Sequence, residues 1–191
     1  MVQTPVKLVT LEEFLQLPKT KPASEYIDGQ IVQKPMPKAD HSEIQGELAS
    51  AINGVLRSSK IGRAFPELRC TFMERSIVPD IVPDIAVLSW KNIPRDEAGK
   101  LSGQLFNAPD WIIEILSLDQ NQTRVVEKIL HALAHGMQMG WLIDPGEESI
   151  LAYNSDSKIS LYKEPEQLLP TPTFAKDFKL TVGDLVSWLY K

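Results

Sequence analysis

The sequence predicts an α/β or α+β domain in which helices flank a central mixed β-sheet, with an N-terminal β-hairpin and a C-terminal helix. The first observation is the order of the expected elements: a helix, strands, one strand that is apolar on both faces, a helix and further strands. The second is the length of 191 residues, for which we expect a single domain over residues 1–191. The third is a composition of 43% hydrophobic and 24% charged residues, which is typical of globular proteins.

The N-terminal third predicts a short helix, a hairpin and a longer helix. Thr10-Leu-Glu-Glu13 has the spacing of a capping box, so a short helix is expected to begin there and to end before Pro18. Residues 25–33 form two β-prone runs joined by Asp28-Gly29, which favours a tight hairpin turn. Residues 41–57 carry apolar residues at helical spacing and predict the first long helix.

The rest of the chain alternates strands and helices. Residues 111–117 are apolar on both faces, which indicates a buried central strand. The other expected elements are strands at 68–73 and 85–90, a loop at 91–107, a helix at 123–135, a strand at 141–144, a hairpin of 150–153 with 159–162, and a last helix from 181 towards 190.

Composition also excludes several classes of protein. No apolar stretch approaches the ~20 residues that cross a bilayer, and residues 1–11 lack the apolar run of a secretory signal, so we expect a cytoplasmic protein without membrane partners. The single cysteine, Cys70, excludes an internal disulfide and a zinc site built from several cysteines. No glycine-rich phosphate loop is present, so a nucleotide cofactor is not expected. The net charge of −5 is unusual for a DNA-binding protein.

Glu114 is the most informative residue in the sequence. It lies inside Trp111-Ile-Ile-Glu-Ile-Leu-Ser117, a strand that is apolar on both sides. A carboxylate taken out of water there must be compensated by a cation or by strong hydrogen-bond donors. A metal site, a catalytic role and a structural salt bridge all meet this requirement.

Two aspartates follow prolines in the repeat Ile77-Val-Pro-Asp80 and Ile81-Val-Pro-Asp84. In an extended segment Asp80 and Asp84 would share a face about 13 Å apart, which is too far to bind one metal ion together. Asp84 precedes the apolar run Ile85-Ala-Val-Leu, so we favour it over Asp80 as the functional aspartate. Turn formation by both residues is the alternative.

Two strand carboxylates that face one cleft suit Mg²⁺ (or Mn²⁺), which prefers oxygen ligands. Glu47 flanks the apolar stripe of the first long helix and is a candidate accessory acid, although a solvated position is equally compatible with the pattern. His41 begins the same helix and could cap it or face the cleft. His131 and His135 have a spacing that could hold zinc, but the order of a zinc peptidase motif is absent.

These residues resemble a known family. Pro83-Asp84-Ile-Ala-Val, Glu114-Ile-Leu-Ser117, a helix carrying Lys128, and Gly136 followed by Trp141-Leu-Ile-Asp144-Pro145 are similar in order and spacing to the Uma-two family of restriction-endonuclease-like proteins, which is abundant in cyanobacteria. Glu25-Tyr-Ile-Asp28-Gly29 and His41 resemble the opening of that family. The resemblance covers most of the chain.

The resemblance implies the PD-(D/E)xK nuclease fold, in which Asp84 and Glu114 would bind the divalent metal and a lysine would stabilise charge during phosphodiester hydrolysis. In the plain motif the lysine lies two residues after the acid, where this chain has Leu116. The family uses a lysine of the following helix, which maps to Lys128. The periodicity of that helix places Lys128 off the apolar face of Val126, Ile129, Leu130, Leu133 and Met137, and Arg124 is an alternative.

We therefore expect a metal-dependent endonuclease acting on DNA, with Asp84, Glu114, Lys128 and Glu47 as candidate catalytic residues. A non-catalytic nucleic-acid or protein interaction module on the same scaffold is the alternative, favoured by the net charge and by Leu116. A homodimer is a further expectation, because pairing the basic faces of two acidic chains would concentrate positive charge on a duplex.

Overall fold

The computed structural model describes residues 8–27, 29–72, 79–103, 105–117, 120–156 and 158–190. The elements are α1 (Leu11–Leu15), β1 (Ser24–Ile27), β2 (Gln30–Gln33), α2 (Ala39–Leu56), β3 (Gly62–Pro66), β4 (Cys70–Thr71), β5 (Asp80–Ile81), β6 (Ile85–Ser89), η1 (Trp90–Asn92), β7 (Trp111–Ile115), α3 (Gln122–Ala134), β8 (Met139–Asp144), β9 (Ser149–Asn154), β10 (Ile159–Tyr162), η2 (Thr173–Ala175), α4 (Val182–Ser187) and η3 (Trp188–Tyr190). Within these ranges every helix is too short or too polar to cross a membrane.

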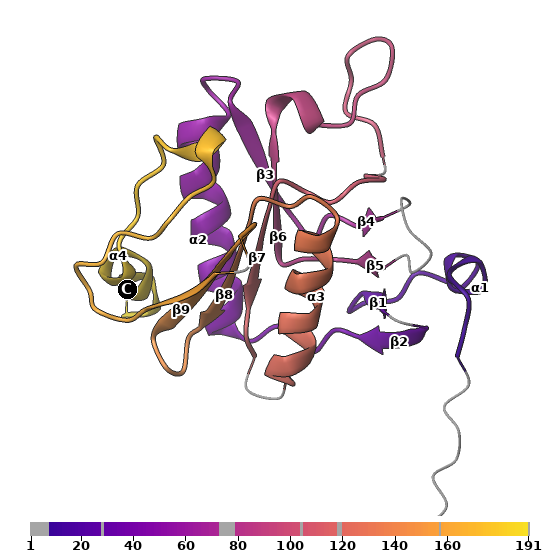
Figure 1. The fold of residues 1–191 in the computed structure, drawn as a ribbon, viewed down its shortest axis with the longest axis horizontal. Coiled ribbons are helices and arrows are strands. Elements are labelled where there is room, and N and C mark those ends of the chain that lie inside the picture. Colours follow the sequence, from indigo (N-terminus) through magenta and orange to yellow (C-terminus); the bar gives the residue numbers. More distant parts are fainter. Residues whose placement is uncertain are drawn as a thin grey trace, which may run out of the picture.

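A six-stranded mixed sheet forms the centre of the fold, in the order β10-β9-β8-β7-β6-β3 (Figure 1). Strands β7 and β8 run parallel, and the other neighbours are antiparallel. A parallel pair needs a crossover connection, which α3 supplies between β7 and β8. The predicted mixed sheet with flanking helices is thus confirmed.

A smaller antiparallel sheet, β2-β1-β5-β4, lies beside the large one. It contains the predicted N-terminal hairpin, in which β1 pairs with β2 from Ser24 opposite Gln33 to Ile27 opposite Gln30. Gly29 has a φ of 78°, a conformation that glycine adopts without strain. The chain passes from β5 to β6 through residues 82–84, so this short link joins the two sheets.

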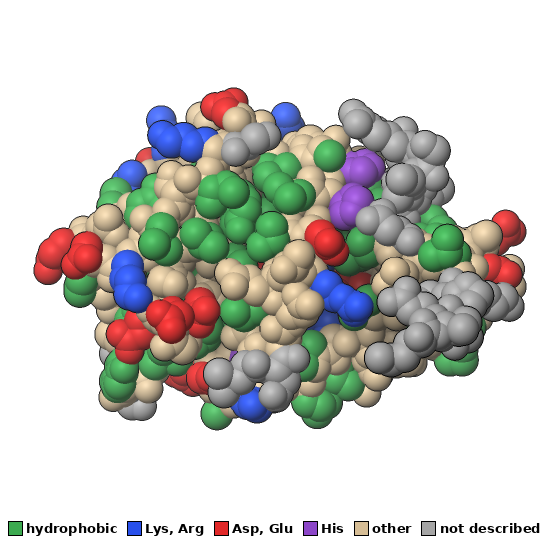
Figure 2. Space-filling view, turned by 60° about the horizontal axis from the view of Figure 1, so that its bottom comes forward, with side chains coloured by type: hydrophobic (Ala, Val, Ile, Leu, Met, Phe, Trp, Pro, Cys, Tyr) green, Lys and Arg blue, Asp and Glu red, His purple; other side chains and the backbone are tan. Residues whose placement is uncertain are grey.

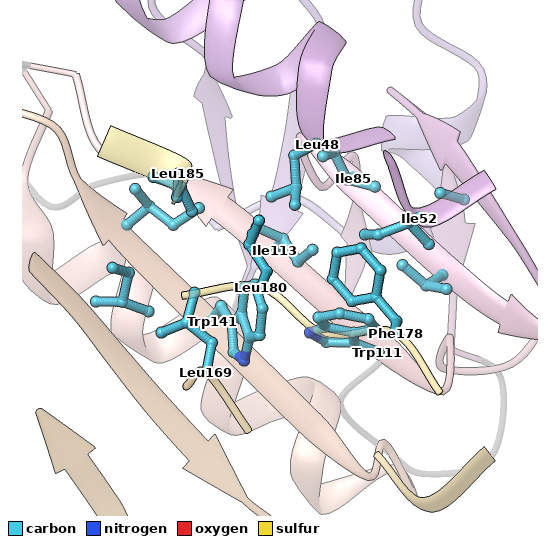
Figure 3. Close-up of a cluster of buried hydrophobic side chains, with 14 of the residues drawn as sticks. Leu48, Ile52, Ile85, Trp111, Ile113, Trp141, Leu169, Phe178, Leu180 and Leu185 are labelled. Carbon is cyan, nitrogen blue, oxygen red and sulfur yellow. The ribbon is translucent and has the colours of Figure 1, made fainter. Parts of the chain in front are cut away.

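Hydrophobic cores cover both faces of the large sheet. On one face, α2, α4 and the C-terminal segment enclose Trp111 and Trp141, whose rings meet edge to face with centroids 4.7 Å apart (Figure 3). On the other face, α3 packs Ile129 against Ile112 and Leu142. Successive side chains of a strand point to opposite faces, so Trp111, Ile113 and Ile115 of β7 belong to the first core and Ile112 to the second.

Local sequence signals agree with several of these elements. The capping box of Thr10 and Glu13 begins α1, and a second capping box, of Thr181 and Asp184, begins α4. Strands β9 and β10 form the predicted hairpin. Asp28, the other residue of the predicted Asp-Gly turn, lies outside the described residues.

Two strand predictions differ from the structure. Strand β3 was not predicted, because Gly62-Arg-Ala-Phe-Pro66 has no apolar run and is defined by its pairing with β6. The strand predicted at 68–73 is limited to β4, and Met73, Ile77 and Val78 lie outside the described residues. The repeated aspartates do not share one extended strand, since Asp80 belongs to the small sheet while Asp84 leads into the large one.

Candidate functional site

Asp84 and Glu114 come together where the two sheets meet. Ile85 pairs with Ile113 and Ala86 with Ile112, so the next position of this antiparallel ladder sets Asp84 opposite Glu114. In β7, Glu114 points to the same face as Ile112, which is the face that α3 covers. These two carboxylates, 30 positions apart in the sequence, therefore face α3 together. Directly opposed residues of a ladder have Cβ atoms roughly 4.5–5.5 Å apart.

The Asp84 carboxylate is buried and well compensated. Its Oδ1 lies 2.6 Å from the Lys34 ammonium, and its Oδ2 lies 3.2 Å from His41 Nε2 and accepts a 2.8 Å hydrogen bond from the Ile115 amide. Burial alone would raise the pKa of Asp84, but the hydrogen bond from His41 and the charge of Lys34 outweigh it and hold the pKa below its ordinary value. Asp84 is therefore ionised at neutral pH.

Glu114 is buried as deeply but is poorly compensated. Its side chain is 1% exposed, and Oε2 lies 2.8 Å from the Lys128 ammonium. Neither carboxylate oxygen accepts a well-directed hydrogen bond from the described residues. Burial raises the pKa of Glu114 to about 8, with the negative charge of Asp84 acting in the same direction and Lys128 opposing it. Few native carboxylates are left in this state, which makes Glu114 the centre of a candidate functional site.

Lys128 bridges two acids from the interior of α3. Its Nζ lies 2.8 Å from Glu114 and 2.9 and 3.2 Å from the two oxygens of Glu25 on β1. Burial alone would lower the pKa of Lys128, but the charges of Glu114 and Glu25 outweigh it and raise the pKa. Lys128 therefore remains a cation inside the protein.

The predicted phase of this helix needs a correction. The buried residues of α3 are Val125, Lys128, Ile129 and Ala132, whereas Leu130 is 46% exposed. Apolar periodicity predicts that Leu130 points towards the core and that Lys128 points towards solvent. In the structure the helix is turned about its axis, and Lys128 points inward, where it forms ion pairs with Glu114 and Glu25.

Glu25 and Lys34 complete the cluster, although no local pattern assigned them a role in the site. Glu25 accepts a 2.7 Å hydrogen bond from the Val82 amide, and Lys34 donates to Glu67 and to the Val82 carbonyl, each at 2.9 Å. Gln45 of α2 donates to the Asp84 carbonyl at 2.7 Å. In the sequence, Glu25 stands out only as the start of the predicted hairpin and as part of the family resemblance. Lys34 precedes Pro35 in a polar segment that is typical of an exposed turn.

The buried cluster carries an excess of negative charge. The carboxylates of Glu25, Asp84 and Glu114 face the ammonium groups of Lys34 and Lys128 and the ring of His41, so there is one carboxylate more than there are cations when His41 is neutral. A proton on Glu114, whose pKa burial raises, would compensate this excess, and a divalent cation could do so in its place. In the described ranges no three His, Cys, Asp or Glu side chains are already grouped as ligands. Two carboxylates suffice for Mg²⁺, which usually keeps several waters.

Two other candidate acids lie outside this cluster. Glu47 is exposed on α2. At about 100° per residue its side chain is turned roughly 120° around the helix from His41, whose ring contacts the Asp84 carboxylate. We therefore leave Glu47 out of the site. Asp80 is held in the small sheet by an ion pair with Arg69 and a 2.7 Å hydrogen bond from Thr71.

The remaining basic and histidine candidates are also placed. Arg124 is exposed one turn before Lys128, and Leu116, in the slot of the motif lysine, packs against the core under α3. His135 Nδ1 lies 2.7 Å from the His131 carbonyl oxygen, and its ring packs against Phe72. This arrangement closes the end of α3 and does not build a zinc site.

Two cavities give access to the cluster. The first, of about 440 Å³, lies between the β1–β2 hairpin and the start of α3, and is lined by Glu25, Lys128 and Arg124 among others. The second, of about 540 Å³, is lined by Asp84, His41 and residues of the segment before β1. Lys34 lines both cavities, Asp84 lines the second, and Lys128, the ion-pair partner of Glu114, lines the first.

Comparison with known proteins identifies relatives of this chain. The Uma2 family model, described as "Putative restriction endonuclease", matches residues 11–183. The crystal structure of a protein described as "a putative nuclease belonging to DUF820" from Anabaena variabilis ATCC 29413 is 52% identical, with a TM-score of 0.90, and the match covers 95% of this chain and 99% of that one. No curated protein matches the sequence. The resemblance found in the sequence is thereby confirmed.

Proposed function

Because the chain belongs to the Uma2 family of restriction-endonuclease-like proteins, we propose that it is a Mg²⁺- or Mn²⁺-dependent endonuclease that hydrolyses phosphodiester bonds of DNA. The observation that carries the proposal is the buried Glu114 carboxylate, which faces Asp84 and accepts no well-directed hydrogen bond. Among the described residues Lys128 is its one close cation, and a metal ion bound between the two carboxylates would satisfy the remaining oxygen atoms.

Asp84 and Glu114 would hold the metal. When bound, the ion would polarise the phosphate and lower the pKa of a water molecule. Asp84 is ionised before any metal arrives, and the hydrogen bonds from His41 and the Ile115 amide fix its orientation. Glu114 would lose its proton on binding, so the affinity for the cation would depend on pH.

Lys128 is the residue that would stabilise the negative charge that develops on the phosphate. It is a buried cation fixed on a regular helix by Glu25, and preorganised donors of this kind contribute most to such reactions. Glu25 acts here as a positioning residue, because it holds the ammonium beside Glu114.

One observation favours the non-catalytic alternative. The ammonium of Lys34 lies 2.6 Å from Asp84, so the protein already supplies a cation to one of the two carboxylates. A metal would have to displace Lys34 or share Asp84 with it. An interaction module on this scaffold would keep the Lys34–Asp84 pair in every state.

The homodimer and the cytoplasmic location stay predictions.

A nuclease assay decides between these functions. Asp84→Ala and Glu114→Ala should each abolish Mn²⁺-dependent cleavage of DNA, while circular dichroism shows that the fold is retained. The control is Glu166→Ala, which removes an exposed acid outside the cluster. This variant should cleave DNA like the wild type. Wild-type cleavage in both site variants would contradict the proposed function.

A further inference from the structure

Three cavities lie next to one another beside the cluster. The first and second share Lys34, Pro35 and Gln120, and a third cavity of about 300 Å³ shares Lys19, Thr20 and Arg69 with the second. We call this row of adjacent cavities the hairpin groove, because β1, β2 and their flanking residues supply much of the wall. Asp84 lines the middle cavity of the row.

Asp84 and Lys128 of the site line cavities of this groove. Asp84 and Glu114 are each 1% exposed and Lys128 is 2% exposed, so a phosphate on the outer surface cannot touch them. Cavities of about 440 and 540 Å³ are of the size that holds a drug-like molecule, comparable to roughly one or two nucleotides. An intact duplex is much wider than such a cavity, whereas one unpaired strand can enter it.

The walls of the groove carry exposed basic and apolar residues besides the acids Glu67 and Glu127. Lys19 and Lys21 are exposed cations of the second cavity and could meet backbone phosphates. Met36, which is 70% exposed, lines that cavity, and Leu17 and Ile31 line the third. Proteins that bind single strands combine a basic track with apolar surfaces for the bases.

The surface offers less to a duplex. On the face drawn in Figure 2, acidic and basic side chains are interspersed rather than gathered into one basic field. The net charge of −5 agrees with this pattern. Duplex binding draws most of its affinity from a broad basic surface that neutralises phosphates on both strands.

We infer that the hairpin groove binds a single, unpaired strand of DNA, such as a flap or a melted end, and excludes an intact duplex. The inference rests on the proposed function for its choice of DNA, and it adds the strandedness of the substrate. Its subject is binding, so it can be tested apart from cleavage.

The test is fluorescence anisotropy of the wild type with a labelled oligonucleotide and with a blunt hairpin duplex of the same sequence, both in Ca²⁺. The single strand should bind at least about tenfold more tightly than the duplex. The double variant Lys19→Glu with Lys21→Glu should lose most of this affinity and show a weaker salt dependence. The matched control, Lys176→Glu with Lys179→Glu, makes the same charge change at exposed positions near the C-terminus and should bind normally.

The opposing outcomes are distinct. Equal or tighter binding of the duplex, no binding of either oligonucleotide, or an equal loss in both double variants would overturn the inference. Tight single-strand binding without cleavage in Mn²⁺ would leave the inference standing and remove the proposed function. Equal cleavage of intact duplex and single strand would remove the inference and keep the nuclease.

Discussion

Asp84 and Glu114 are neighbouring carboxyl groups whose pKa values the fold moves in opposite directions. The pKa of Asp84 is held down by His41 and Lys34, whereas burial raises that of Glu114 to about 8. Pairs of titratable groups whose pKa values are driven apart are typical of functional sites. In the proposed metal site, Asp84 would supply a permanent charge and Glu114 a carboxyl group that loses its proton when a cation binds.

The raised pKa of Glu114 makes it a source of instability at high pH. A carboxyl group whose folded pKa lies above its ordinary value of 4.5 binds a proton more tightly in the folded state, so stability falls as the pH rises from 4.5 to about 8. Glu114→Gln removes the titrating group and with it this pH-dependent loss of stability. With a chelator present, the free energy of unfolding of Glu114→Gln minus that of the wild type should rise between pH 4.5 and about 8, by a few kcal/mol at pH 8. Urea denaturation at several pH values measures this difference in stability. A difference that does not change with pH would contradict the raised pKa of Glu114.

Lys128 should be required for folding as well as for activity. Lys128→Met leaves Glu25 and Glu114 buried without their shared cation, and breaking a buried pair in this way costs about 3–5 kcal/mol. Arg124→Met makes the same change one turn earlier at an exposed position and should alter stability by less than about 0.5 kcal/mol. Thermal and urea unfolding compare the two, and equal effects would show that Lys128 is not a buried ion-pair partner.

At the scale of the elements, helix α3 shows which signals in the sequence can be trusted. Its existence and its approximate bounds, predicted as 123–135 and found as Gln122–Ala134, follow from periodicity, but its rotation does not. A pattern read locally assigns a lysine to the solvent, and here acids from β1 and β7 reverse that assignment. Strand β3 fails for a related reason, because its pairing with β6 defines it rather than its own residues. Elements with a local signal, such as the hairpin and the capped helices, are predicted well.

The close packing of α3 on the sheet is what positions Lys128. A Cβ atom at Gly140 of β8 would lie 2.5 Å from Ile129 Cγ2, on a stiff side chain next to Lys128. Gly140→Ala should therefore push α3 outward, cost about 1–3 kcal/mol and reduce cleavage. Gly54→Ala, where no atom lies within 4 Å of the new Cβ, should raise stability by about 0.5–1 kcal/mol. Urea unfolding and the cleavage assay measure both variants, and normal behaviour of Gly140→Ala would mean that the contact is loose.

For the whole molecule, the site exists only because distant segments converge. Lys34 and Asp84 are 50 positions apart, and Glu25 and Lys128 are 103 apart. The sequence could single out Glu114, since a lone carboxylate in an apolar strand is a local anomaly, and Asp84, since it precedes the next strand. The sequence could not assign Lys34 to the site or exclude Glu47 from it. Each assignment depends on which side of the hairpin and which side of α2 face the junction of the two sheets.

The central claim is that Asp84 and Glu114 hold a divalent metal ion. Calorimetric titration of Mn²⁺ into the wild type, Asp84→Asn and Glu114→Gln tests it without knowledge of the substrate. Asp80→Asn is the matched control, because Asp80 is a buried aspartate outside the cluster. The account predicts saturable binding in the wild type and in Asp80→Asn and none in the two site variants. Binding that persists in both site variants, or no binding in the wild type, would contradict it.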